Sequence, residues 1–345
     1  MHILNWDNLV GVHCGSVAIR NVANYYGVDY EEELCFGLGS GMGFFYNKNT
    51  IGKPSEVIHL RAPNMEPNFF SSGKVKYAWQ KEASPEIAKK NLIQDIKDGF
   101  PVFLQTDIYY LDYYNSSAHF PGHVIVCMGV DEKRKFFYVS DTNFQDVQQV
   151  SFDDMDMARS SKAEPYPLYF NHFTVKSFLP FENLKIKIED SILKNSVNYL
   201  MGQESERGTS SIFSLLEWAS NLEKWNYLPD SSHVFRFAYQ VIVKRGSKGA
   251  GFRFIYHDFL SIAEKESSVI KKLKLTREMK KISNKWNQIG LLLKEGSRKS
   301  TNANLSNLIL SVKEVFALEY SFHTRVVDSL GSKKKGAQSP FFNIF

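Results

Sequence analysis

The pattern of apolar residues changes near Leu184, and this change constrains the fold more than any other feature of the sequence. Before Leu184, short runs of β-branched and aromatic residues are separated by turn residues, which predicts strands at residues 101–110, 123–131 and 135–141. After Leu184, apolar residues recur at steps of three and four, which predicts helices. One face of a long amphipathic helix is predicted to contain Leu275, Met279, Ile282, Trp286, Ile289 and Leu293.

These patterns divide the chain into parts. We predict the α+β fold class, with an antiparallel sheet, for a first domain over residues 1–184, and an all-α helical domain over residues 185–332. Residues 305–330 repeat the helical pattern, and two or three further helices are expected between Leu184 and Leu275. The closing residues 333–345 are expected to form a flexible tail.

The first domain also carries signals for helices and loops. Residues 14–26 predict a helix that ends at Gly27, and residues 83–100 predict another. Four glycines within residues 36–47 match neither G-x-G-x-x-G nor a Walker loop, so we expect no nucleotide site there. We interpret that segment as a mobile loop at the rim of a site, or equally as ordinary turns.

The charge of the chain is unevenly distributed. Residues 185–345 hold 26 Lys and Arg against 15 Asp and Glu, whereas residues 1–184 hold 16 against 22. A basic half can attract nucleic acid, an anionic membrane surface or an acidic protein, but lysines on a solvated helix face are the simpler interpretation. Because no recognised nucleic-acid-binding motif is present, we expect no nucleic-acid partner.

Neither secretion nor a membrane location is indicated. No run of about 18 apolar residues exists, and the first 15 residues lack the pattern of a signal peptide, so we expect a cytoplasmic protein without a membrane partner. The three cysteines have no C-x-x-C spacing and predict neither a disulfide framework nor a zinc site. His119 and His123 could face a metal together only on a helix, which Pro121 and Gly122 oppose, so we expect no metal.

Cys14 is the first candidate for chemistry. It begins the helix predicted over residues 14–26, and the positive end of a helix dipole favours a thiolate. The alternative is a small buried residue that only packs. A nucleophilic cysteine needs a base and a group that orients the base. His123 opens one predicted strand and Asp141 ends the next, so a hairpin would place them side by side.

This order of Cys, His and Asp predicts a catalytic triad. His123 would take the proton of Cys14, and Asp141 would fix the tautomer of His123. The oxyanion hole would combine the Cys14 backbone N–H with the side-chain amide of Asn8, six residues earlier. We expect Tyr109, Tyr110 and His119 to line the substrate pocket, although tyrosines on a strand are core residues at least as often.

Four stretches resemble a known family. They are HCGSVAIRNVANYYGV, EEELCFGLGSGMGFFY, DIYYLDYYNSSAHFPGHVIVCMGVD and YVSD, and they are similar to the N-terminal domain of butirosin biosynthesis protein H and its relatives. The segment GSKGAGFRFIYHDFLSIA, residues 246–263, resembles the companion domain of that family. The resemblance covers nearly the whole chain.

The resemblance implies a papain-like cysteine enzyme related to the peptidases that trim bacteriocin leaders. It implies Cys14 as nucleophile, His123 as base and Asp141 as orienting residue. The leader peptidases carry Gln six residues before the cysteine, where this chain has the shorter Asn8.

The function implied by the resemblance is an acyltransferase of antibiotic biosynthesis. An acyl group would pass from an acyl carrier protein to Cys14 and then to a small-molecule amine, with phosphopantetheine arriving on the carrier protein and no resident cofactor. The alternatives are a thioesterase, amidase or peptidase on the same triad, and a binding protein without catalysis. A homo-oligomer is compatible with the sequence.

Overall fold

The computed structural model describes residues 1–48, 50, 54–71, 77–164, 166–205, 208–245, 248–298 and 302–332. The predicted tail at residues 333–345 lies outside this part of the chain. The chain divides into two compact units. Unit 1 comprises Met1–Gly39 and Asn64–Phe181, and unit 2 comprises Ser40–Pro63 and Glu182–Phe345. The sequence did not predict that residues 40–63 belong with the helices.

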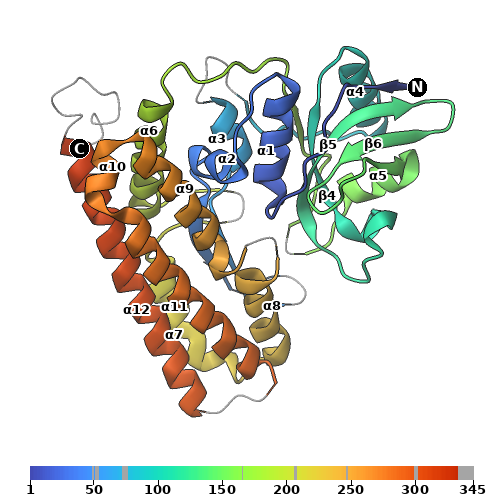
Figure 1. The fold of residues 1–345 in the computed structure, drawn as a ribbon. Helices are drawn as coiled ribbons and strands as arrows, with labels where there is room; N and C mark the ends of the chain where they lie inside the picture. Colours follow the sequence, from blue (N-terminus) through green and yellow to red (C-terminus); the bar gives the residue numbers. More distant parts are fainter. Residues whose placement is uncertain are drawn as a thin grey trace. The chain divides into compact units, whose positions relative to one another are not determined.

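Unit 1 is built on an antiparallel sheet (Figure 1). Its strand order is β7-β6-β5-β4-β8, and β1 also pairs with β5. The strands are β1 (His2–Ile3), β4 (Val102–Asp107), β5 (Pro121–Asp131), β6 (Phe136–Ser140), β7 (Gln148–Ser151) and β8 (His172–Thr174). The antiparallel sheet expected from the sequence is therefore present, and the three predicted strands correspond to β4, β5 and β6.

Helices pack on both faces of this sheet. They are α1 (Cys14–Tyr25), α2 (Glu32–Leu38), α3 (Met65–Ser71), α4 (Pro85–Lys97) and α5 (Phe152–Ser160). On one face, apolar residues of α4 and α5 pack against alternate residues of β4, β5 and β6, including Leu104, Ile125 and Val139. On the other face, Tyr25 of α1 packs against Met128 and Tyr138. Alternation along the strands thus gives each layer of helices its own apolar surface.

The glycine-rich segment is regular structure. Residues 36–47 were expected to form a mobile loop or turns, but they contain the end of α2 and the strand β2 (Met42–Asn47). This strand pairs antiparallel with β3 (Val57–Arg61), and Phe44 and Phe45 are buried. The strand was not predicted because glycine occupies every second position in this segment, and the apolar residues between and after the glycines were therefore not recognised as a strand pattern.

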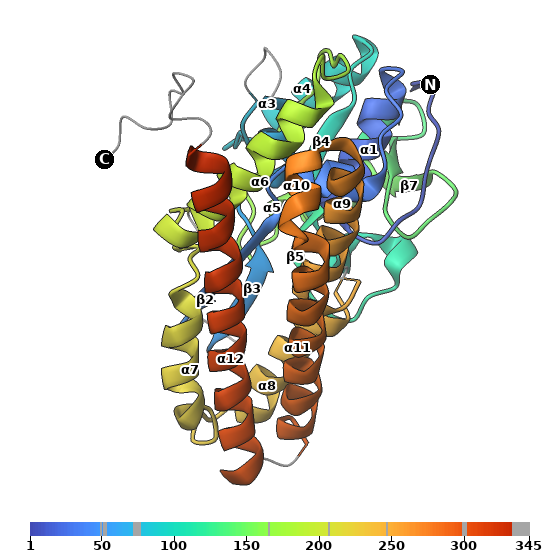
Figure 2. The same cartoon turned by 60° about the vertical axis from the view of Figure 1, so that its left-hand side comes forward.

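Unit 2 is mostly helical (Figure 2). Its helices are α6 (Leu184–Met201), α7 (Ser214–Trp225), α8 (Ser231–Val243), α9 (Arg253–Glu266), α10 (Ser268–Leu273), α11 (Leu275–Gly296) and α12 (Asn302–Val326). The face predicted from Leu275 to Leu293 is buried along α11, as expected. In the described part of residues 185–332, five helices precede α11 where two or three were expected, and the predicted helical character of these residues is confirmed. The strands β2 and β3, from residues 40–63, pack among these helices.

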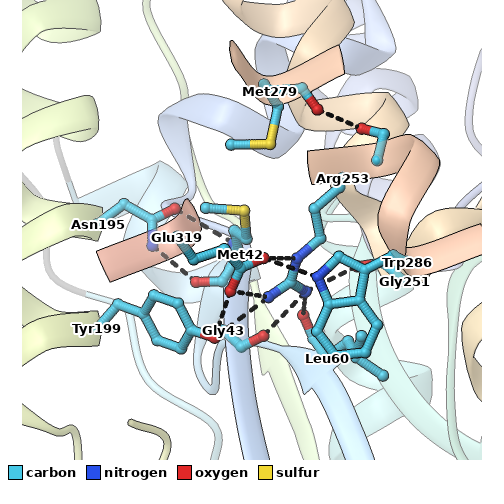
Figure 3. Close-up of polar contacts among 11 residues, drawn as sticks. Met42, Gly43, Leu60, Asn195, Tyr199, Gly251, Arg253, Met279, Trp286 and Glu319 are labelled. Carbon is cyan, nitrogen blue, oxygen red and sulfur yellow. Dashed lines mark hydrogen bonds and ion pairs between the residues drawn. The ribbon is translucent and has the colours of Figure 1, made fainter. Parts of the chain in front are cut away.

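A buried ion pair attaches β2 and β3 to the helices (Figure 3). Nε of Arg253 donates to Glu319 at 2.8 Å, and both side chains are inaccessible to solvent. Nη1 of Arg253 donates to the backbone oxygens of Gly43 in β2 and Leu60 in β3, at 3.1 and 3.2 Å. Trp286 and Tyr199 donate to Glu319, each at 2.8 Å. Every charge in the cluster therefore has hydrogen-bond partners, as burial of charge requires.

The chain reaches Arg253 through a left-handed segment. Residues Lys248 to Phe252 all have positive φ, between 53° and 81°. A Cβ on Gly251 would lie 2.1 Å from Cδ2 of Leu60, so only glycine allows this close approach to β3.

We expect Arg253→Met to lower the free energy of unfolding by about 3–5 kcal/mol, because Glu319 would stay buried without its cation. Denaturant unfolding measures the change. Lys285→Met is the matched control, since Lys285 pairs with Glu314 at the surface, and it should cost less than about 1 kcal/mol. Equal effects of the two variants would contradict a stabilising role for the buried pair.

Candidate active site

Cys14 is the first residue of α1, as its sequence predicted. His13 is the N-cap, with extended backbone angles, and its Nδ1 accepts a hydrogen bond from the Ser16 N–H at 3.2 Å. A side-chain acceptor at this position satisfies one of the open N–H groups of the first turn. The thiol is half-buried at the positive end of the helix dipole.

Two carboxylates from neighbouring helices shape this helix terminus. Glu32 of α2 accepts hydrogen bonds from the backbone N–H groups of Val12 and His13 and from the Ser16 hydroxyl, at 2.8–3.2 Å. Glu66 of α3 lies so close to Gly15 that a Cβ there would be 2.1 Å from its Oε1. Glu32 therefore holds the turn before Cys14 by hydrogen bonds, and Glu66 leaves no room for a side chain at position 15.

The structure brings His123 and Asp141 together. Val126 of β5 pairs with Ser140 of β6, so the antiparallel register places Asp141 beside the start of β5. Nε2 of His123 lies 2.8 and 2.9 Å from the two carboxylate oxygens of Asp141, and both residues are buried. Cys14 lies within hydrogen-bonding reach of His123. The three side chains predicted as a triad are thus neighbours.

The charge of His123 is stabilised by this arrangement. Burial alone would lower the pKa of the imidazole, because it disfavours the charged form. The carboxylate of Asp141, together with the interaction with Cys14, outweighs burial and raises that pKa from 6.5 to about 10. A protonated imidazole next to Cys14 favours the thiolate at neutral pH.

Asp141 has further partners that the sequence analysis did not assign to it. Tyr113 and Tyr114 donate their hydroxyl hydrogens to its two oxygens at 2.8 and 3.1 Å, and the Thr142 N–H donates at 2.6 Å. Tyr113 and Tyr114 belong to η2 (Asp112–Tyr114), a 3-10 turn that follows a first one, η1 (Ile108–Tyr110). The strand predicted over residues 101–110 therefore ends at Asp107, and its last three residues form η1.

The segment before Cys14 is attached to the segment around Asp141. The Gly11 N–H donates to the Thr142 backbone oxygen at 3.0 Å, and Nδ2 of Asn21 donates to the Ser140 hydroxyl at 3.1 Å. These bonds join the start of α1 to the end of β6. They bring together residues that lie more than a hundred positions apart in the sequence.

Asn8 contributes to the same attachment. Its Nδ2 donates to the backbone oxygens of Phe144 and Gln145 at 2.6 and 3.1 Å, and its Oδ1 accepts from Ser140. An amide nitrogen carries two hydrogens, so both are occupied. The predicted oxyanion role of Asn8 would require one of these bonds to break.

Tyr109, Tyr110 and His119 form a separate group. They gather at the end of β4, where Nδ1 of His119 lies 2.6 Å from the buried Asp107 carboxylate. Tyr109 stacks on His119, and Tyr110 contacts the edge of this pair, with its ring centroid 5.0 Å from that of Tyr109 and 5.8 Å from that of His119. Their predicted role in substrate binding stays a prediction.

The positions of the other two cysteines do not favour a reactive thiolate. Cys35 and Cys127 are fully buried, and burial raises the pKa of both thiols, to about 12 for Cys127. Among the residues that the structure describes, no group of three or more His, Cys, Asp or Glu could hold a metal ion. The described helices include none that is long and apolar enough to cross a membrane.

Two family models match consecutive parts of the chain, although their boundary does not coincide with that of the two compact units. The family model described as butirosin biosynthesis protein H, N-terminal, matches residues 13–142, and the domain of unknown function DUF4872 matches residues 153–326. The second match alone covers half of the chain, and the two follow one another as in the family's two-domain layout. The chain belongs to the butirosin biosynthesis protein H family. A search of curated proteins finds no match.

The two family models match different groups of the residues described above. Cys14, His123 and Asp141 all fall within the residues matched by the butirosin protein H model, whereas Arg253 and Glu319 fall within the match to DUF4872. The candidate site therefore belongs to the part of the family that is named after butirosin biosynthesis.

We expect Cys14 to react with iodoacetamide at a rate that changes little between pH 7 and pH 8.5. The raised pKa of His123 keeps the imidazolium beside Cys14 at both pH values, which favours the thiolate at both. Asp141→Asn removes the charge that raises this pKa, so we expect the variant to react more slowly at pH 7, by about tenfold for each pKa unit lost. Stopped-flow alkylation with Cys14→Ser as the labelling control measures both; a wild-type rate that titrates like a free thiol contradicts the ion pair.

For Asn8→Ala we expect a loss of stability rather than a loss of catalysis. Two hydrogen bonds to backbone oxygens disappear, at about 1 kcal/mol each, whereas removal of an oxyanion donor costs about 100-fold or more in kcat. Thermal unfolding and the single-turnover acylation rate of Cys14 distinguish these effects. A fold that is as stable as wild type, with acylation slowed more than 100-fold, would restore the oxyanion assignment.

Proposed function

We propose that this protein is a cysteine-dependent acyltransferase of antibiotic biosynthesis, acting from an acyl carrier protein thioester to an amine. The observation that supports the proposal is the juxtaposition of Cys14, His123 and Asp141 at a helix N-terminus, in a chain of the butirosin protein H family. The papain-like relationship, the role of each residue and the carrier protein are parts of the same proposal.

In the first half-reaction, the Cys14 thiolate attacks the carbonyl carbon of the thioester. The thiolate of the carrier leaves and takes the proton of the His123 imidazolium, which gives acyl-Cys14, neutral His123 and the free carrier thiol. The Cys14 backbone N–H, in the first turn of α1, would donate to the oxyanion of the tetrahedral intermediate. Exchange between two thioesters is nearly isoenergetic, so catalysis depends on orientation.

In the second half-reaction, a neutral amine attacks the carbonyl of acyl-Cys14. Acylation has removed the Cys14 thiolate, one of the groups that raise the pKa of His123, so the imidazole can act as a base in this step. The nitrogen loses one proton to neutral His123, the C–S bond breaks, and the thiolate–imidazolium pair is restored. Asp141 holds the imidazole in place in both half-reactions, while Tyr113, Tyr114 and the Thr142 N–H donate to its carboxylate.

The basic surface of the second half suits an acidic carrier protein. Six cations form its densest run, and all are exposed: Lys271, Lys272, Lys274, Arg277, Lys280 and Lys281. A positive patch would raise the association rate with an acidic partner and would attract the phosphate of its phosphopantetheine arm. A cytoplasmic location and a homo-oligomer remain expectations.

Intact-protein mass spectrometry tests the proposal. After mixing with acylated pantetheine or acylated carrier proteins, we expect a mass gain at Cys14 that is absent from Cys14→Ser and reduced about 100-fold or more in rate in His123→Ala. Added primary amines should remove the acyl group faster than buffer does.

Two outcomes would change the assignment. Adduct decay that does not depend on amines would favour a hydrolase, because water would then be the acceptor. No adduct with any donor, together with an unreactive Cys14, would favour a binding protein that keeps the fold without the chemistry.

A further inference from the structure

A second carboxylate–imidazole pair lies at the same end of the sheet as the first. Asp107 ends β4, and Nδ1 of His119 lies 2.6 Å from its Oδ2. The side chain of Asp107 is fully buried, whereas 42% of the His119 side chain is exposed. Outside the proposed triad, this pair has the same construction as His123 and Asp141: a buried carboxylate that holds one ring nitrogen.

Asp107 is fully provided with hydrogen-bond donors. Its Oδ1 accepts from the backbone N–H groups of Phe120 and Tyr109 at 2.8 and 3.1 Å. Its Oδ2 accepts from the Ser161 hydroxyl at 2.7 Å in addition to His119. The His119 tautomer that suits these contacts carries its hydrogen on Nδ1, donates it to Asp107 and presents the lone pair of Nε2.

The ring of His119 is fixed in place by aromatic contacts. Tyr109 stacks on it with ring centroids 4.1 Å apart and an interplanar angle of 28°, and 44% of Tyr109 is exposed. The groups that face His119 are therefore Asp107 from β4 and Tyr109 and Tyr110 from η1, with Ser161 behind Asp107. An oriented base beside an exposed aromatic ring suits a ligand that carries an ammonium group, through a hydrogen bond and a cation–π contact.

The pair lies close to the proposed triad. Thr106 pairs with His123 across β4 and β5, and the next residue, Asp107, pairs with Pro121. The two carboxylate–imidazole pairs therefore lie at the same end of the paired strands β4 and β5, with an irregularity in the register between Thr106 and Asp107. The same connection between β4 and β5 supplies Tyr113 and Tyr114 to Asp141 and Tyr109 and His119 to Asp107.

The proposed reaction needs a second base. An alkylamine is protonated at pH 7, as lysine is with a pKa of about 10.4, and an ammonium has no lone pair with which to attack a thioester. Two protons must therefore leave the nitrogen before the amide is complete. Neutral His123 can take one of them, and that proton restores the thiolate–imidazolium pair.

We propose that His119 is the base that takes the first proton from the ammonium of the acceptor amine. The ammonium donates its proton to Nε2 of His119, the free amine attacks acyl-Cys14, and the second proton passes to His123. His119 then returns its proton to solvent. This inference rests on the proposed acyl transfer and names a catalytic residue for its second half-reaction.

The test separates acylation from transfer. Acyl-Cys14 is formed from acyl-pantetheine in wild type and in His119→Gln, excess donor is removed, and its decay is followed by mass spectrometry with two amines at equal concentration. Ethylamine is protonated at pH 7, whereas 2,2,2-trifluoroethylamine is neutral. In His119→Gln we expect normal acylation, a loss of about 100-fold in transfer to ethylamine, and wild-type transfer to trifluoroethylamine.

The pH dependence gives an independent readout. Transfer to ethylamine by His119→Gln should rise with pH until it approaches the wild-type rate near the pKa of the amine, because solvent then supplies the free base. His233→Gln, at an exposed histidine of α8, is the matched control and should behave as wild type throughout. A purely structural role of His119 would instead reduce transfer to both amines equally at every pH.

The possible failures are distinguishable. If His119→Gln transfers to ethylamine at pH 7 as fast as wild type, the role of His119 is wrong and acyl transfer stands. If wild type forms acyl-Cys14 but neither amine accelerates its decay, or if no adduct forms, the proposed acyl transfer itself fails, and this inference fails with it.

Discussion

The candidate site depends on the hydrogen bonds that the Asp141 carboxylate accepts. This carboxylate is buried, and it accepts hydrogen bonds from His123, Tyr113, Tyr114 and the backbone N–H of Thr142. These donors come from β5, from the 3-10 turns before β5 and from the end of β6. One charge therefore fixes the tautomer of the imidazole and the path of the β4–β5 connection together, because each donor must stay within hydrogen-bonding distance of it.

The sequence was sufficient to predict those elements whose pattern lies in neighbouring residues. The helix that begins at Cys14 has an N-cap and a closing glycine, and the buried face of α11 repeats regularly. The neighbouring positions of His123 and Asp141 followed from the short hairpin between them. These features depend on residues close together in the chain, which is why their pattern predicts them.

The features that the sequence could not predict depend on contacts between residues far apart in the chain. Asn8 was assigned to an oxyanion hole by its spacing from Cys14, but its amide is occupied by the Phe144 and Gln145 backbone oxygens, 136 and 137 residues away. Tyr113 and Tyr114 were known as aromatic residues near the site, yet nothing in their spacing identifies Asp141 as their acceptor. Residues 40–63 join unit 2 through Arg253, and no local pattern connects a glycine-rich strand with an arginine 210 residues later.

That last connection has a consequence for synthesis of the chain. The backbone oxygens of Gly43 and Leu60 emerge from the ribosome early, whereas Arg253 follows Gly43 by 210 residues and Glu319 follows Arg253 by 66. At about 5–20 residues per second, the nascent strands β2 and β3 wait more than ten seconds for the side chains that complete their core. During that interval Phe44 and Phe45 of β2, which are buried in the finished protein, lack the helices that cover them.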